Sequence, residues 1–102
     1  MKVVLSDNAE RDLEAIGDWI AQDNPARAIS FTVELLRACR EIGSAPGSFP
    51  LVDGQRDPTL RRRVHGNYLI FYDVGKNAVE ILHILHGARD YERIIFADDD
   101  PG

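Results

Sequence analysis

Three consecutive arginines in the second half of the chain, Arg61, Arg62 and Arg63, have the type and spacing to do chemistry. On a strand, alternate side chains share a face, so Arg61 and Arg63 are expected on one side and Arg62 on the other. Two guanidinium groups on one face can hold a phosphate or an acidic protein surface. The pattern is also typical of a charged edge strand, where like charges prevent aggregation.

Two histidines, His83 and His86, suggest a metal site, but their spacing argues against it. Residues three apart on a strand point to opposite faces, so we expect no shared metal ion. His83 is predicted to be a packed, hydrogen-bonded core histidine, and the residues expected on its face are Val79, Ile81 and Leu85. His86 and Arg89 stand near the strand end, where functional residues are common.

No other catalytic signature is present in the sequence. There is no phosphate-binding glycine loop, no dinucleotide fingerprint, no serine–histidine–aspartate order and no zinc-ligand spacing. The single cysteine, Cys39, falls in a helical apolar pattern and is expected to pack rather than react. The sequence therefore implies no cofactor and no metal.

Size and charge limit the class of protein further. The 102 residues, 44% of them hydrophobic, suit one domain, expected over residues 1–97 with an acidic disordered tail at 98–102. A formal net charge of −5 argues against a protein that coats nucleic acid. No apolar run is long enough to cross a membrane, and residues 1–6 are too short for a targeting signal. We expect a soluble cytoplasmic protein.

The first half of the chain predicts two helices that would support these side chains. Apolar residues at helical spacing indicate one helix from Asp7 to Gln22, with Ser6 or Asp7 as its N-cap. Asn24 and Pro25 form a cap and first-turn signal for a second helix that stops at Gly43. The short connection between them predicts a helical hairpin.

The second helix has more apolar surface than the first can cover. One stripe contains Ala28, Phe31, Leu35, Ala38 and Ile42, and a neighbouring stripe contains Ile29, Val33 and Leu36. The second stripe must therefore meet a sheet or another protein.

The strands are expected at Lys2–Leu5, Leu60–His65, Asn67–Val74 and Ala78–His86. Short turns at Gly66-Asn67 and at residues 75–77 predict an antiparallel meander for the last three. The fold class is then α+β, in the order β-α-α-β-β-β, with the helices packed on one face of the sheet.

Motifs spread over nearly the whole chain carry a resemblance to a known family. The helices contain Ala9-x-x-Asp12-Leu13-x-x-Ile16, Asp23-Asn24-Pro25 and Phe31-x-x-x-Leu35. The strands contain Leu60-Arg61-Arg62, Tyr68-x-Ile70-Phe71-Tyr72 and His83-Ile84-Leu85-His86-Gly87-Ala88-Arg89-Asp90. In this order, from Val3 to Arg93, they resemble the ParE-type toxins of the ParE/RelE superfamily.

The resemblance implies the toxin of a type II toxin–antitoxin module, associated with plasmid stabilisation. It implies a ParD-like antitoxin whose C-terminal segment wraps the toxin, with Trp19, Ile29, Val33 and Leu36 as candidate contacts. It also implies that the target is DNA gyrase, which the toxin would inhibit by binding rather than by turnover. The toxin alone is not expected to bind DNA sequence-specifically. The candidate target-binding residues are Arg61, Arg63, His86, Arg89, Tyr91 and Arg93.

Two alternatives stay open. RelE-type ribonucleases of the same superfamily cleave ribosome-bound mRNA with basic residues on the sheet and a C-terminal proton-transfer residue. The residues that would resemble such a site are Arg61, Arg63, His86, Arg89 and Tyr91. No lysine lies in the loop before Leu60 or among the three arginines, which disfavours that hypothesis. The other alternative is a non-toxic member that only binds its antitoxin.

Overall fold

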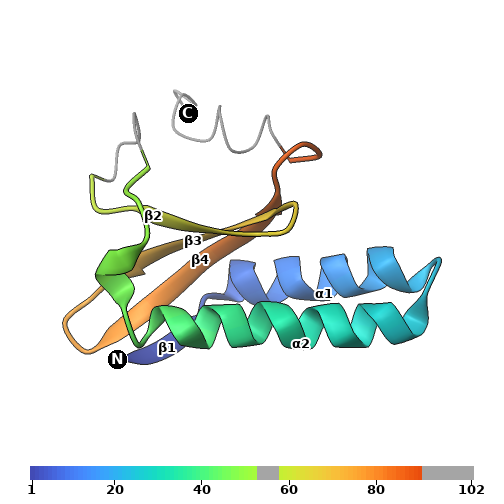
Figure 1. Cartoon of the computed structure of the whole chain (residues 1–102), viewed down its shortest axis with the longest axis horizontal. Helices are drawn as coiled ribbons and strands as arrows, with labels where there is room; N and C mark the ends of the chain where they lie inside the picture. Colours follow the sequence, from blue (N-terminus) through green and yellow to red (C-terminus); the bar gives the residue numbers. More distant parts are fainter. Residues whose placement is uncertain (53–57, 91–102) are drawn as a thin grey trace.

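A computed structural model describes residues 1–52 and 58–90 of the chain. The elements, in order, are β1 (Lys2–Leu5), α1 (Asp7–Ala21), α2 (Pro25–Ile42), the short 3-10 helix η1 (Pro46–Ser48), β2 (Arg61–His65), β3 (Tyr68–Val74) and β4 (Ala78–His86). The two helices lie side by side along one face of the sheet (Figure 1). The predicted α+β class is confirmed. The acidic tail predicted at 98–102 lies outside the described residues.

Both helices begin at the residues whose side chains can cap them. Ser6 Oγ accepts the backbone N–H of Ala9 at 3.0 Å, and Asn24 Oδ1 accepts that of Arg27 at 3.0 Å. Each cap satisfies one of the backbone donors that a helix start leaves unpaired. α2 then ends one residue before Gly43, as predicted.

The sheet has four strands in the order β1-β4-β3-β2. β2, β3 and β4 pair antiparallel, as predicted, and the turn between β2 and β3 uses Gly66 at φ +59°, a conformation that glycine adopts without strain. β1 pairs with β4 in parallel, so the sheet is mixed. β4 and β3 are central, and β2 is an edge strand.

A β-bulge in β4 overturns one prediction about His83. Ile81 pairs with Tyr72, whereas His83 pairs with Phe71. Since Tyr72 and Phe71 are consecutive, their side chains point to opposite faces, and so do Ile81 and His83. The prediction that His83 shares a face with Val79 and Ile81 was wrong, because the bulge adds one residue to β4 and inverts the alternation beyond it.

The hydrogen bond predicted for His83 is confirmed, but its place in the core is not, because 34% of the His83 side chain is exposed. β1 stops at Leu5, which pairs with Ile81, and α1 runs along β4 beyond that point. There Asp12 Oδ2 accepts the backbone N–H of Ile84 at 2.9 Å and lies 2.8 Å from Nδ1 of His83. A carboxylate from α1 thus satisfies a strand donor that β1 is too short to reach.

The core lies between the helices and the sheet. Its largest fully buried side chains are Tyr72, Leu35, Ile42, Ile70, Ile81, Ile84, Val79 and Cys39. The Tyr72 hydroxyl donates to the carbonyl of Pro46 at 2.7 Å, which ties η1 to the sheet. Among residues 1–52 and 58–90, neither helix is both long and apolar enough to span a membrane.

Candidate partner-binding site

Arg61 and Arg63 lie on the same face of β2, as predicted, and both donate to the protein itself. Arg61 Nη1 donates to the carbonyl of Phe49 at 2.6 Å and, at 3.4 Å, to that of Gly47. Arg63 Nη1 donates to the carbonyl of Ala38 at 2.8 Å. These bonds fasten the loop around η1 and the last turns of α2 to the edge strand.

Arg63 has two further contacts that hold it in place. Its Nη2 lies 2.8 Å from Oε1 of Glu41, and its guanidinium stacks over the ring of Phe49 at 5.0 Å from the centroid. Only 20% of the Arg63 side chain is exposed. Its charge and several of its donors are therefore already matched within the fold.

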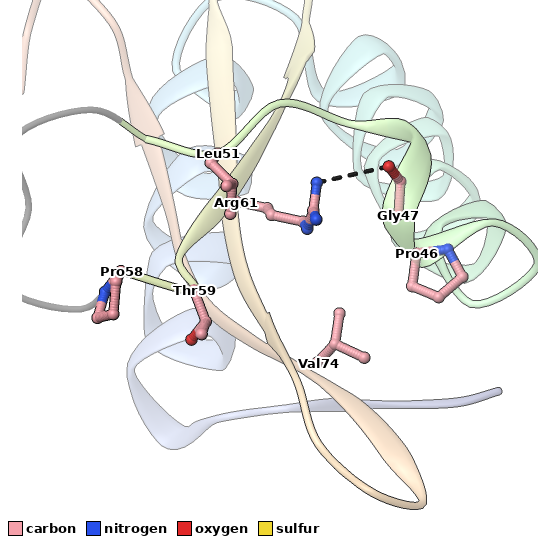
Figure 2. Close-up of a pocket in the computed structure, with 7 residues that line it drawn as sticks. All are labelled: Pro46, Gly47, Leu51, Pro58, Thr59, Arg61 and Val74. Carbon is pink, nitrogen blue, oxygen red and sulfur yellow. Dashed lines mark hydrogen bonds between the residues drawn. The ribbon is translucent and has the colours of Figure 1, made fainter.

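A shallow pocket lies beside Arg61 (Figure 2). Its lining residues are Pro46, Gly47, Leu51, Pro58, Thr59, Arg61 and Val74. The Arg61 side chain extends from β2 across the pocket toward Gly47, so its bonds to the loop carbonyls form part of the pocket wall. No sequence pattern predicted this pocket, because its residues come from separate segments of the chain.

His86 and Arg89 lie at the opposite end of the sheet, where β4 ends (Figure 1). Nδ1 of His86 accepts the backbone N–H of Arg89 at 2.9 Å, and the backbone N–H of His86 donates to Oδ2 of Asp90 at 2.8 Å. The two bonds close a tight turn after the strand. His86 therefore orients the Arg89 backbone, and the lone pair of its Nδ1 is occupied by that bond.

The Arg89 side chain lies against two aromatic rings. Its guanidinium carbon is 4.7 Å from the ring centroid of Trp19 and 5.9 Å from that of Tyr68. Its Nη2 donates to the Tyr68 hydroxyl at 3.2 Å. No carboxylate of the described residues pairs with it. We call Trp19, Tyr68, His86 and Arg89 the Arg89 cluster.

Aromatic contacts continue from the Arg89 cluster toward α2. The ring of Tyr68 is 5.4 Å from that of Phe31, which in turn is 5.7 Å from His65. Arg27 stacks over Phe31 at 5.0 Å and forms an ion pair with Glu34. The hydrogen bond from Arg27 holds the pKa of the Glu34 carboxyl below its usual value. Arg27 and Glu34 therefore balance each other's charge within the fold.

Sequence reasoning missed Tyr68 as a partner of Arg89. Tyr68 was interpreted only as one residue of an apolar strand, although it immediately follows the two-residue turn after His65. That position placed it at the same end of the sheet as the close of β4, and the expected antiparallel pairing puts Tyr68 opposite His86. The expected strand register could therefore have identified Tyr68 as a neighbour of the end of β4.

The candidate antitoxin contacts do not form one surface. Ile29 and Val33 are 70% and 48% exposed on α2, and Leu36 is half-buried beside them. Trp19 is elsewhere: Gly17 faces Thr32 of α2, and a residue two positions later on a helix is about 200° further round. Trp19 therefore points away from α2, where Arg89 covers part of its ring.

The remaining candidates add no second site. Tyr91 and Arg93 lie outside the described residues. Cys39 is buried, and desolvation raises the pKa of its thiol to about 11 against the opposing effect of Arg63, so the thiol is unreactive near neutral pH. Within the described ranges, no three His, Cys, Asp or Glu side chains gather closely enough to hold a metal ion.

Comparison with known proteins gives the family. A family model described as the ParE toxin of the type II toxin–antitoxin system parDE matches residues 3–91. A solved structure, "Chromosomal ParDE TA system from P. aeruginosa", shares the fold with a TM-score of 0.73 at 17% identity, covering 84% of this chain and 95% of that one. None of the curated proteins matches. The chain belongs to the ParE toxin family of type II toxin–antitoxin systems.

Proposed function

We propose that this protein inhibits DNA gyrase by binding to it and is neutralised by a ParD-like antitoxin. Membership of the ParE toxin family supports the proposal. The observation that carries binding over turnover is the separation of the basic side chains. Arg61 and Arg63 lie along β2 and donate to the carbonyls of Phe49 and Ala38, while His86 and Arg89 lie at and beyond the end of β4.

The ribonuclease alternative would require those side chains to converge on one phosphate. Cleavage by a 2′-hydroxyl requires a proton acceptor and a charge-stabilising donor within hydrogen-bond distance of the reacting atoms. Among the described residues, the candidate arginines of β2 are held by Phe49, Ala38 and Glu41 instead. No observation on the described residues favours this second function.

For the antitoxin, we propose the exposed row Ile29, Val33 and Leu36 of α2 as the docking surface. Covering an exposed aliphatic side chain contributes roughly 1 kcal/mol or more of binding free energy. An amphipathic segment laid along α2 would use contacts at the spacing that helix-in-groove recognition requires. The surplus apolar stripe predicted from the sequence is this row.

The decisive experiment measures gyrase activity on plasmid DNA. Purified toxin should reduce ATP-dependent supercoiling in a dose-dependent way, and titration with the antitoxin should restore it. Normal supercoiling with excess toxin, together with cleavage of mRNA on ribosomes, would replace the proposal by the ribonuclease alternative. Neither activity, with intact antitoxin binding, would indicate the non-toxic member.

The antitoxin surface is tested by a matched pair of substitutions. Val33→Asp on α2 should weaken antitoxin affinity by about 100-fold, because an unpaired charge would be buried in an apolar contact. Val64→Asp on β2 is the control, since Val64 is 61% exposed and lies on another face of the molecule. Equal losses in calorimetric titrations of the two variants would contradict the assignment to α2.

A further inference from the structure

Arg89 lacks the carboxylate partner that Arg27 and Arg63 have among the described residues. Arg27 pairs with Glu34, and Arg63 pairs with Glu41. Among the described residues, Arg89 has instead two aromatic neighbours, and its side chain makes a single hydrogen bond to them, to the hydroxyl of Tyr68. A guanidinium carries several N–H donors in a fixed plane, and it stays protonated in proteins. Most donors of this cation are therefore available to a partner.

We propose that Trp19, Tyr68 and Arg89 form one binding site for a carboxylate side chain of the toxin's protein target. The inference rests on the proposed inhibition of gyrase and specifies its chemistry. Arg89 binds the carboxylate, Trp19 adds an apolar surface beside it, and Tyr68 is a positioning residue that acts through Arg89.

The aromatic contacts prepare Arg89 for this role. A cation over the face of a tryptophan or tyrosine ring is attracted by the ring quadrupole, and the stack restricts the rotamers of a long side chain before a partner arrives. Tryptophan, tyrosine and arginine are also the residue types that dominate binding energy at protein interfaces. Trp19 stays 55% exposed beside the guanidinium, so apolar area and charge are presented together.

A protein carboxylate fits this site better than a nucleic-acid phosphate. The chain has a formal net charge of −5, which repels a polyanionic backbone at long range. A carboxylate on an apolar protein surface requires only one local pairing, and the planar fork of an arginine can pair with it in two parallel hydrogen bonds. The target site should therefore be an acidic residue next to an apolar one.

Gyrase affinity of charge variants tests the chemistry directly. Arg89→Gln should weaken binding by about 10- to 100-fold, and Arg89→Glu by about tenfold more, because a like charge then faces the target carboxylate. Tyr68→Phe, which keeps the ring and removes the hydroxyl, should weaken binding by only about 2- to 5-fold. Arg27→Gln is the matched control: it removes another ring-stacked arginine, outside the Arg89 cluster, and should leave gyrase affinity unchanged.

Footprinting gives a second, independent readout. Gyrase should protect Trp19 from hydroxyl-radical oxidation, measured by mass spectrometry, whereas a duplex DNA oligonucleotide alone and the antitoxin should not. Antitoxin affinity should be the same for all four variants, which shows that they fold.

The outcomes separate the two proposals. Failure of the unchanged toxin to bind or inhibit gyrase overturns the proposed function and this inference with it. Gyrase binding that is equally strong in Arg89→Gln, or equally weak in Arg89→Gln and Arg89→Glu, overturns the inference alone. Protection of Trp19 by DNA without gyrase overturns it in favour of a phosphate ligand.

Discussion

The two ends of the sheet use arginine in opposite ways. In the first half of β2, Arg61 and Arg63 donate to loop and helix carbonyls, and Arg63 also pairs with Glu41. At the end of β4, Arg89 rests on Trp19 and Tyr68 and has no carboxylate partner among the described residues. The irregular segment around η1 has carbonyls without regular partners, and nearby arginines supply the donors. The comparison shows that neighbouring acceptors decide whether an arginine stabilises the fold or remains available for binding.

The largest expected effect on stability is that of Arg63→Ala. Removing this side chain breaks the hydrogen bond to the Ala38 carbonyl and the ion pair with Glu41 and exposes the ring of Phe49, so the free energy of unfolding should fall by about 2 kcal/mol. Urea denaturation followed by circular dichroism measures it. A loss as large in Arg89→Ala would erase the contrast between the two ends.

The next largest expected effect on stability is that of alkaline pH, which acts through the buried thiol of Cys39. Burial raises the pKa of the Cys39 thiol from 9.0 to about 11, so the folded state holds its proton more tightly than the unfolded state does. The stabilisation is complete below pH 9 and is lost as pH rises toward 11, on the order of 1 kcal/mol at pH 10.

The test is the slope of unfolding free energy against pH. Cys39→Ala should remove most of the decline between pH 9 and 11, with a remainder from Tyr72, whose hydroxyl also has a pKa raised by burial. An unchanged slope in Cys39→Ala would show that the thiol is not its source.

A smaller effect is expected for Tyr72→Phe. The substitution removes the hydrogen bond to the Pro46 carbonyl while keeping the buried ring, at a cost of about 1 kcal/mol. Tyr68→Phe, the corresponding change at the other end, removes a bond to an exposed cation and should cost less. The test is thermal unfolding of the two variants under the same conditions. A lower melting temperature for Tyr68→Phe than for Tyr72→Phe would contradict the comparison.

The smallest expected change in stability is that of Arg89→Gln, within about 0.5 kcal/mol of the unsubstituted protein, because the guanidinium is exposed and makes only one hydrogen bond with the described residues. Its effect should appear in gyrase affinity instead. Differential scanning calorimetry of the variant, run alongside the binding measurement, tests this prediction. A fall in melting temperature as large as that of Arg63→Ala would refute it.

Much of the fold could be predicted from local patterns. The caps at Ser6 and Asn24, the stop before Gly43 and the turn at Gly66 each depend on one or two residues and their backbone geometry. The strand bounds were within about a residue of those observed, since a two-residue alternation bounded by turn residues is a strong signal. The bulge in β4 was not predictable, because the same alternating letters fit a strand with or without it.

The candidate site was only partly accessible to the same reasoning. His86 and Arg89 were recognised because they follow a strand end, and the exposed row on α2 because its apolar residues exceed what α1 can cover. The grouping of Arg61 and Arg63 with Arg89 came from residue type alone. Their distinct roles depend on acceptors contributed by segments remote in sequence, such as Phe49 and Ala38.

The sequence by itself determined the order and bounds of the elements, the α+β class and the family, because periodicity, caps, turns and motif order are properties of neighbouring residues. Only the tertiary structure decided which cations are available for a partner. Trp19 and Arg89 are far apart in the chain, and they meet because α1 packs along β4 and the turn after His86 directs Arg89 back over that helix. Such a contact depends on register, a bulge and helix orientation together, which no local pattern encodes.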